Sequence, residues 1–124
     1  MTTANTQVAR DYIENIWNKG KTEDAAKYIA DDLIQHNPNL ADGRKPLVEF
    51  IDSTRGQLPG LRFDIRRTAA EGDLVFVHSL FLPAAGQRGL AVIDVFRIQD
   101  GVIAEHWDLN EAVPETTASG REIV

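Results

Sequence analysis

Asp94 is the residue whose place in the sequence best suits it to acid–base chemistry. Apolar residues alternate with others from Leu90 to Ile98, and Asp94 takes one of the apolar places in that row. A carboxylate among large apolar side chains either finds hydrogen-bond donors or has its pKa raised by desolvation. A raised pKa suits a carboxylate to work as a general base near neutral pH. The alternative is a strand carboxylate paired with Arg67 or Arg97.

His78 is a second candidate for chemistry. It lies in an apolar row beside Phe76, and a two-residue turn at 72–73 sets it opposite Arg67. We predict that this row faces the same side of the sheet as Asp94, where a histidine could donate to a developing oxyanion. The simpler interpretation is a core histidine that bonds to a carbonyl, or one that is partly solvated at a sheet edge.

His36 is the third candidate. It precedes Asn37 and Pro38 at the end of an extended segment that should border the space between helices and sheet. The proline disfavours a helical conformation of the residue before it, which supports an extended segment here. A histidine at this border could reach a ligand in that space. The alternative is an ordinary loop or cap histidine.

The register of the second hairpin decides which neighbours Asp94 has. A two-residue turn at 100–101 sets Asp94 opposite Trp107. Trp107 then faces the same side of the sheet and could form a wall of a pocket, whereas His106 and Asp108 point to the other side. A three-residue loop would reverse this assignment.

Hydrophobic periodicity predicts the elements that must position these residues. Apolar residues at helical spacing predict three helices, over 8–17, 22–28 and 44–57, with an extended segment at 33–38. The first helix should stop at 18–20 and the second should be capped by Thr22. Beyond Gly60 the period changes to two and predicts four strands, from 61 to a turn at 71–73 and over 74–82, 90–98 and 102–109.

Helices first and a meander of strands second is an α+β plan. The helices must cover one face of the sheet, which leaves a concave space between the two layers. We see no repeat and no tract of proline, glycine or serine long enough to act as a linker. The sequence therefore predicts a single domain over 1–124, with a polar tail from about residue 116.

The composition excludes several classes of site. The chain has no cysteine, which excludes zinc ribbons, iron–sulfur clusters, thiol nucleophiles and disulfide frameworks. It also has no HExxH pattern, no serine in a GxSxG context and no glycine spacing that would cradle a phosphate. We therefore expect neither a metal nor a cofactor.

Charge and hydropathy bear on partners and compartment. Thirteen Lys and Arg against nineteen Asp and Glu leave a formal charge of −6 in 124 residues, which repels nucleic acids and anionic membrane surfaces. The first twelve residues lack the pattern of a signal peptide, and no apolar run approaches the roughly eighteen residues of a membrane span. A soluble, cytoplasmic protein without nucleic-acid or membrane partners is the expectation.

Two segments carry a family resemblance. IQHNPNLADGR and IDVFRIQDGVIAEHWDLNEAVPE, together with the order of the elements, resemble the SnoaL-like branch of the nuclear transport factor two-like superfamily. The resemblance covers about residues 8–115. It implies a cone-shaped, cystatin-like fold, in which three helices pack on a strongly curved, mostly antiparallel sheet and a pocket opens at the wide end. Members commonly pair through the outer face of the sheet, so it also implies a homodimer.

The resemblance also implies roles for individual residues. The polyketide cyclase of this family closes a ring by intramolecular aldol condensation without metal or cofactor, which needs one base and donors for an enolate. By position the base falls on Asp94, the pocket histidine on His78, and the histidine of the QHNP string on His36. Trp107 and Asp108 match the EHWD string. The remaining expected substrate contacts are Phe76, Phe96, Asn37 and Arg67.

We therefore expect a cofactor-independent lyase or isomerase that acts on a small apolar carbonyl compound. The alternative is a non-catalytic module of the same fold that binds a ligand, dimerises or binds a partner through its sheet. Two related enzyme types fit less well. Ketosteroid isomerases use a tyrosine, and here Tyr12 and Tyr28 both fall on predicted helices. Limonene-type epoxide hydrolases use an Arg-x-Asp sequence, and Val92 occupies the place of that arginine.

Overall fold

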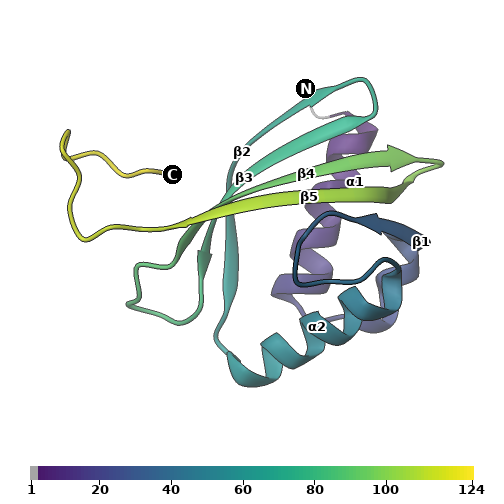
Figure 1. Cartoon of the computed structure of the whole chain (residues 1–124), viewed down its shortest axis with the longest axis horizontal. Helices are drawn as coiled ribbons and strands as arrows, with labels where there is room; N and C mark the ends of the chain where they lie inside the picture. The colour runs from purple at the N-terminus through teal and green to yellow at the C-terminus, as the bar shows by residue number, and fades with distance from the viewer. Residues whose placement is uncertain (1–2) are drawn as a thin grey trace.

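A five-stranded sheet with helices along one of its faces forms the structure, a computed structural model that describes residues 3–124 (Figure 1). The strand order is β1-β5-β4-β3-β2; β1 runs parallel to β5, and the other neighbours are antiparallel. The α+β plan predicted from the sequence is confirmed. The strands are β1 (Ile29–Gln35), β2 (Arg62–Glu71), β3 (Leu74–Leu82), β4 (Leu90–Gln99) and β5 (Val102–Ala112).

The first predicted helix is present but changes its winding halfway. Helix α1 (Ala4–Tyr12) begins at Thr3, whose hydroxyl accepts from the backbone N–H of Thr6, and it continues as the π-helical turn η1 (Ile13–Asn18). The chain then leaves the helix through Gly20, whose φ of 71° lies in the left-handed region that glycine adopts without strain.

The other two predicted helices are also present. Helix α2 (Arg44–Gln57) has the predicted bounds, with Pro46 in its first turn. The short second helix is the 3-10 helix η2 (Thr22–Lys27), but the predicted cap is wrong. Lys21 stands at the N-cap, and the Thr22 hydroxyl instead donates to Oδ1 of Asp52 on α2 at 2.7 Å.

The core fills the space between the helices and the sheet. Its fully buried side chains come from both layers, with Ile13 and Ile16 from η1, Ile51 from α2, and Val77 and Phe96 from the sheet. Burying a side chain of this size stabilises the fold by roughly 1.5–3 kcal/mol. These contacts hold the helices at a fixed height over the sheet.

Two β-bulges reverse the face of the sheet to which the side chains beyond them point. The turns themselves are as predicted, since Glu71 pairs with Leu74 and Gln99 pairs with Val102. In β2, however, Arg66 is an extra residue between the pairs on either side of it, and in β5 Ala104 is another. Side chains alternate along a strand, so one extra residue sends every later side chain to the opposite face.

The tail beyond β5 turns back toward β2, as Figure 1 shows at its yellow end. The guanidinium of Arg66 donates to the carbonyl oxygen of Val124 at 3.1 Å and lies 3.7 Å from the carboxylate of Glu122. No helix in the part of the chain that the structure describes is long and apolar enough to cross a membrane.

Candidate active site

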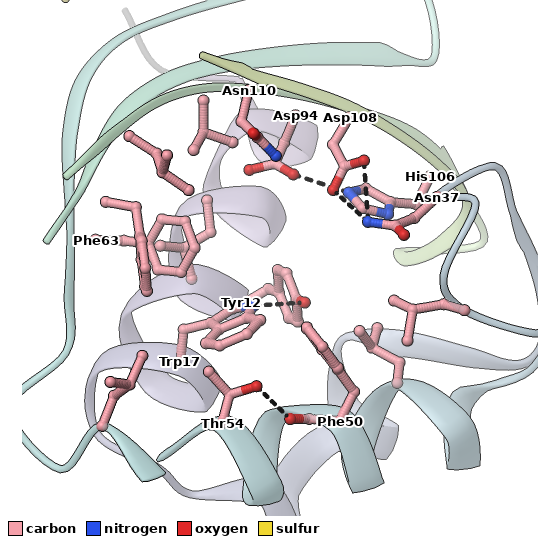
Figure 2. A pocket seen from close by; sticks show the side chains of 17 residues that line it. Tyr12, Trp17, Asn37, Phe50, Thr54, Phe63, Asp94, His106, Asp108 and Asn110 are labelled. Carbon is pink, nitrogen blue, oxygen red and sulfur yellow. Dashed lines mark hydrogen bonds and ion pairs between the residues drawn. The ribbon is translucent and has the colours of Figure 1, made fainter. Parts of the chain in front are cut away.

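A cavity of about 210 Å³ lies between the helices and the sheet. Figure 2 shows polar side chains of β4 and β5 along its sheet wall, with Tyr12 and Trp17 across from them. The polar residues of the lining include Asn37, Asp94, His106, Asp108 and Asn110, and the apolar ones include Ile13, Leu47, Phe50, Phe63, Phe81 and Val92. No lysine or arginine of the described chain lines the cavity.

Asp94 faces this cavity from the middle of β4, on the side that the alternation in the sequence predicted. Its side chain is only 12% exposed, and its Oδ1 lies 2.8 Å from Nε2 of His106 in a shared hydrogen bond. Burial raises the pKa of Asp94, the bond and the charge of His106 oppose that rise, and the nearby charge of Asp108 adds to it. The alternative partners are engaged elsewhere, since Arg97 contacts Glu105 and Arg67 contacts His78.

His106 and Asp108 also face the cavity, which corrects the register drawn from the sequence. The bulge at Ala104 places His106 opposite Phe96 and Asp108 opposite Asp94, instead of Trp107 opposite Asp94. Asn37, the expected substrate contact, donates through Nδ2 to both carboxylate oxygens of Asp108, at 3.2 and 3.0 Å. Asp94, His106 and Asp108 therefore form one polar cluster on adjacent strands.

Tyr12 completes the cavity from the helical side. The π-helical turn brings the indole N–H of Trp17 to within 3.0 Å of the Tyr12 hydroxyl oxygen, to which it donates. Burial and the charge of Asp94 raise the pKa of Tyr12, so the phenol keeps its proton. Tyr12 was predicted from the sequence only as part of a helix and not as a site residue, because an α-helical pattern gives no signal for a contact between residues five apart.

Phe96 supports the site without lining the cavity. Its ring stacks on the imidazole of His106, with centroids 5.2 Å apart, and meets the ring of Tyr12 edge-on at 5.7 Å. Phe96 was expected to contact the substrate directly, but in the structure it does not line the cavity. Phe96 instead contacts the rings of both His106 and Tyr12 and so supports them by packing.

His78, Arg67 and Phe76 lie on the outer face of the sheet, which overturns their predicted place beside Asp94. Arg67 is opposite His78 as predicted, and the two side chains form a hydrogen bond, but the bulge at Arg66 turns Arg67 outward. Burial, then Arg67, then Arg66, lower the pKa of His78. Both faces of β3 carry apolar side chains. Val75 and Val77 point into the core, whereas Phe76 and its row point to the outer face.

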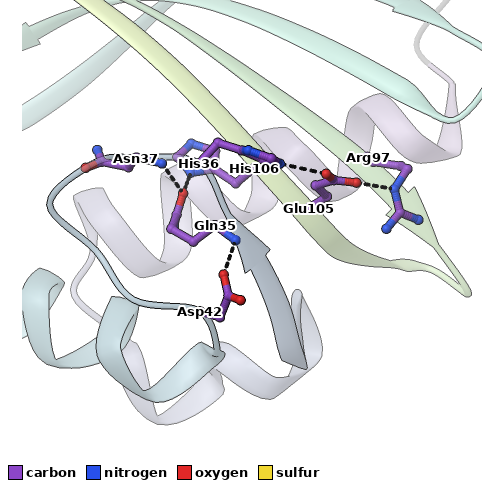
Figure 3. Close-up of polar contacts among 7 residues, drawn as sticks. All are labelled: Gln35, His36, Asn37, Asp42, Arg97, Glu105 and His106. Atoms are coloured by element: carbon purple, nitrogen blue, oxygen red, sulfur yellow. Dashed lines mark hydrogen bonds and ion pairs between the residues drawn. The ribbon is translucent and has the colours of Figure 1, made fainter.

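His36 and Trp107 are also outside the cavity. Their rings stack with centroids 4.7 Å apart, and Nε2 of His36 donates to Glu105 at 2.7 Å, while Nε of Arg97 donates to the other carboxylate oxygen at 2.9 Å (Figure 3). Hydrogen bonds from His36, and then from Arg97, lower the pKa of Glu105. The bulge at Ala104 explains the error for Trp107, because it turns that side chain away from Asp94.

The cluster of Asp94, His106 and Asp108 offers one ligand atom each within 4.8 Å of one another, which is a spacing that a metal ion could bridge. The atoms are already bonded within the protein, however. His106 Nε2 shares a hydrogen bond with Asp94, and both oxygens of Asp108 accept from Asn37. A cation at Nε2 of His106 would have to replace the hydrogen bond between His106 and Asp94.

Comparisons with known proteins place this geometry in context. The family model of the SnoaL-like domain matches residues 9–106. A search of curated proteins gives no significant match. Among solved structures, a candidate polyketide cyclase from Acidithiobacillus ferrooxidans aligns with 18% identity and a TM-score of 0.72 over 90% of each chain.

Two further structures are similar to this chain. A candidate ketosteroid isomerase from Kribbella flavida shares 21% identity with a TM-score of 0.74, over 94% of this chain and 84% of that one. A SnoaL-like protein from Burkholderia thailandensis shares 18% identity with a TM-score of 0.75, over 90% of this chain and 98% of that one. At these identities the likeness shows the fold, which is the one that the sequence resemblance implied.

Proposed function

We propose that this chain, which belongs to the SnoaL-like domain family, is a cofactor-independent isomerase or lyase that removes a carbon-bound proton from a small apolar carbonyl compound. One observation carries the proposal. Asp94 is a buried carboxylate in an apolar cavity, with Oδ1 bonded to His106 and Oδ2 without a hydrogen bond to the described residues. That second oxygen is the base.

The reaction begins with a proton transfer. Oδ2 of Asp94 takes a proton from the carbon beside the substrate carbonyl. The C–H electron pair forms a carbon–carbon double bond and the π pair of the carbonyl moves to its oxygen, which gives an enolate. In an isomerase, Asp94 returns the proton to another carbon of the enolate. In an aldol-type lyase, the enolate carbon attacks a second carbonyl, and Asp94 returns its proton to the new alkoxide. Either route leaves Asp94 as it started.

Tyr12 is the donor that holds the enolate oxygen in this proposal. Because the indole of Trp17 donates to the Tyr12 oxygen, the hydroxyl proton of Tyr12 is free to donate to a ligand in the cavity. Its raised pKa keeps that proton in place at neutral pH. A fixed donor aimed at developing negative charge is a large source of rate enhancement in enolate chemistry.

The cavity also limits the ligand. An engineered apolar cavity of about 150 Å³ holds benzene, so about 210 Å³ suits a molecule of one or two small rings. The carboxylates of Asp94 and Asp108 disfavour anionic ligands, as does the overall charge of −6. We accordingly propose a neutral, largely apolar substrate and no nucleic-acid or membrane partner.

Isomerisation is favoured over closure of a large ring system. The observation that favours it is Tyr12, because a tyrosine lines the same cavity as Asp94, although the sequence suggested that no tyrosine was available. The small volume of the cavity supports the same choice. A hydrolase of the limonene-epoxide type has less support, since Val92 lines the cavity where that enzyme type has an arginine.

Proton exchange tests the proposal and separates an enzyme from a ligand-binding module. Small cyclic ketones and β-dicarbonyl compounds are incubated with the protein in heavy water, and loss of the α-proton signal is followed by NMR. We expect exchange above the buffer rate with the wild type and none with Asp94→Asn. Asp100→Asn, which changes an exposed carboxylate in the hairpin turn, is the matched control and should exchange like the wild type. Binding without exchange would contradict the proposal.

We also propose that the chain forms a homodimer through the outer face of its sheet. Large apolar side chains are exposed there, including Phe76 at 38% and Leu109 at 78%. A second copy presents the same patch, so a two-fold interface would bury it twice. Light scattering of the wild type should give twice the chain mass, and Leu109→Asp should shift it to the monomer. A monomeric wild type at micromolar concentration would rule the dimer out.

A further inference from the structure

Gln35 contacts the catalytic pair from the side away from the cavity. It ends β1 beside β5, and its backbone N–H donates to Oδ1 of Asp42 at 2.8 Å (Figure 3). Its side-chain oxygen Oε1 accepts from the backbone N–H of Asn37 at 3.1 Å and lies 2.8 Å from Nδ1 of His106. The side chain of Gln35 is thereby fixed between a loop and the imidazole.

These contacts determine which end of the Gln35 amide faces His106. A backbone N–H can only donate, so the amide atom that meets the N–H of Asn37 must be the oxygen. The other end, Nε2, is buried without a hydrogen-bond partner among the described residues. A flipped amide would give Nε2 a partner in His106 but would set two donors against each other at Asn37. The oxygen therefore faces His106.

We infer that Gln35 is a positioning residue that forces the Nδ1 proton onto His106 and so makes the Asp94–His106 pair hold one more proton, between Nε2 of His106 and Oδ1 of Asp94. Because Oε1 of Gln35 can only accept, Nδ1 of His106 must be the donor across 2.8 Å. Nε2 is then bare in the neutral ring, yet it lies 2.8 Å from Oδ1 of Asp94. Two bare acceptors repel at that distance, so a proton lies between them.

The shared proton leaves the pair without net charge. The pair is either a carboxylate beside an imidazolium or a carboxylic acid beside a neutral imidazole, and burial favours both over a pair with charge −1. Without Gln35, His106 can take the other tautomer, in which Nε2–H donates to the Asp94 carboxylate and Nδ1 is bare. That pair carries one proton fewer and a charge of −1.

The effect of the proton shared by His106 and Asp94 on catalysis rests on the proposed function. In the form with an imidazolium, Oδ2 of Asp94 takes the substrate proton while the positive charge of His106 lies beside the new enolate. The reacting groups then become a carboxylic acid, an imidazolium and an enolate, and their total charge stays at zero throughout. The other ionisable groups that line the cavity are Asp108, held by Asn37, and Tyr12, held by Trp17.

Nitrogen NMR of the substrate-free protein tests the inference directly. The chain has three histidines, so long-range ¹H–¹⁵N spectra are simple, and His36→Gln and His78→Gln assign the His106 signals without changing the cavity. We expect a proton on Nδ1 of His106 in the wild type at neutral pH. In Gln35→Leu, Nδ1 should move to the shift of a bare, pyridine-type nitrogen. In Gln35→Glu, whose carboxylate also accepts, the Nδ1 proton should return.

A bare Nδ1 in the wild type, or an Nδ1 that stays protonated in Gln35→Leu, would overturn the inference. The exchange assay is run in parallel, and there Gln35→Leu should lose activity by a factor on the order of ten or more, with recovery in Gln35→Glu. The two experiments distinguish a failure of the proposed function from a failure of the role of Gln35. If the wild type shows no exchange but has the expected tautomer, the proposed function is wrong and the role of Gln35 stands. A merely structural role would change the melting temperature and leave the tautomer as it is.

Discussion

Trp17 donates its indole N–H to the hydroxyl oxygen of Tyr12, five residues earlier, at 3.0 Å. In an α-helix, residues five apart point about 140° away from each other, since each residue turns by about 100°. The π-helical turn over Ile13–Asn18 is wider and brings such residues back to one side, as the i to i+5 bond from Lys19 to Glu14 shows. The change of winding therefore brings the indole of Trp17 to the side of the helix on which Tyr12 lies.

Replacing Tyr12 with Phe removes the proposed enolate donor and keeps the ring. We expect α-proton exchange to fall by roughly 10²–10³, the usual cost of losing one such donor. Trp17 loses its acceptor at the same time, which should lower the free energy of unfolding by about 1–3 kcal/mol. Heavy-water exchange and urea denaturation measure the two effects. Tyr28→Phe, which removes a hydroxyl bonded to Asn15 outside the cavity, should leave exchange unchanged; exchange at the wild-type rate in Tyr12→Phe would disprove the role.

Asp94 should also affect how stability depends on pH. Its pKa in the folded protein is raised above the usual value of 3.8, so the folded chain holds a proton there that the unfolded chain releases earlier. Stability from this group is present below about pH 3.8 and is lost as pH rises through the folded pKa. Asp94→Asn, which carries no charge, should therefore be more stable than the wild type at pH 7, by an amount that shrinks toward pH 4. Urea titrations across this range would show the opposite trend if the pKa were lowered.

Much of the fold could be predicted from the sequence because the local signals agree with the packing. The bounds of α2 follow from Arg44, Pro46 and the apolar face after them, and the Asp100–Gly101 turn has the positive φ values, 54° and 80°, that its residue types favour. Asp94 stood out because a carboxylate broke an apolar row. Asn37 and Asp108 were expected as substrate contacts, and both line the cavity.

The rest could not be predicted because it depends on the two bulges. Nothing in the residue types at Arg66 or Ala104 signals an extra residue, yet each reverses the side chains beyond it. His106 enters the cavity and Trp107 leaves it for this reason alone. The side of β3 was ambiguous for another reason: both of its rows are apolar, so alternation could not choose between them. Choosing the wrong row placed His78 in the cavity.

The outward positions of His36 and His78 predict that both are dispensable for the proposed reaction. We expect His36→Gln and His78→Gln to exchange substrate protons within about twofold of the wild type, because neither side chain lines the cavity. His106→Gln should lose exchange, since the partner of Asp94 is gone. Assays at equal protein concentration, with circular dichroism to confirm folding, separate the three variants. A large loss of proton exchange in His78→Gln alone would show that this histidine takes part in the reaction.

Glu105 should stabilise the fold in a way that depends on pH in the direction opposite to Asp94. Hydrogen bonds from His36 and Arg97 hold its pKa below the usual 4.5. Its contribution is therefore present above that value and is lost as pH falls through the lower pKa of the folded state. Glu105→Gln should unfold at lower urea concentrations than the wild type at pH 7, and the difference should shrink progressively as the pH falls below 4.5. A constant difference across this range would mean that packing, and not charge, is responsible.

Metal ions should act on this site as inhibitors. Zn²⁺ prefers the nitrogen and carboxylate ligands that Asp94, His106 and Asp108 offer within 4.8 Å of one another. Binding would break the bond between His106 and Asp94 and would occupy the base, so we expect added Zn²⁺ to suppress α-proton exchange. Prior treatment with a chelator should leave the exchange rate unchanged, because in the proposed reaction protons move only between Asp94 and the substrate. Asp108→Asn, which weakens the ligand set, should require more Zn²⁺ for the same inhibition. If the chelator abolished exchange and Zn²⁺ restored it, the cluster would be a catalytic metal site and the proton-sharing pair would be wrong.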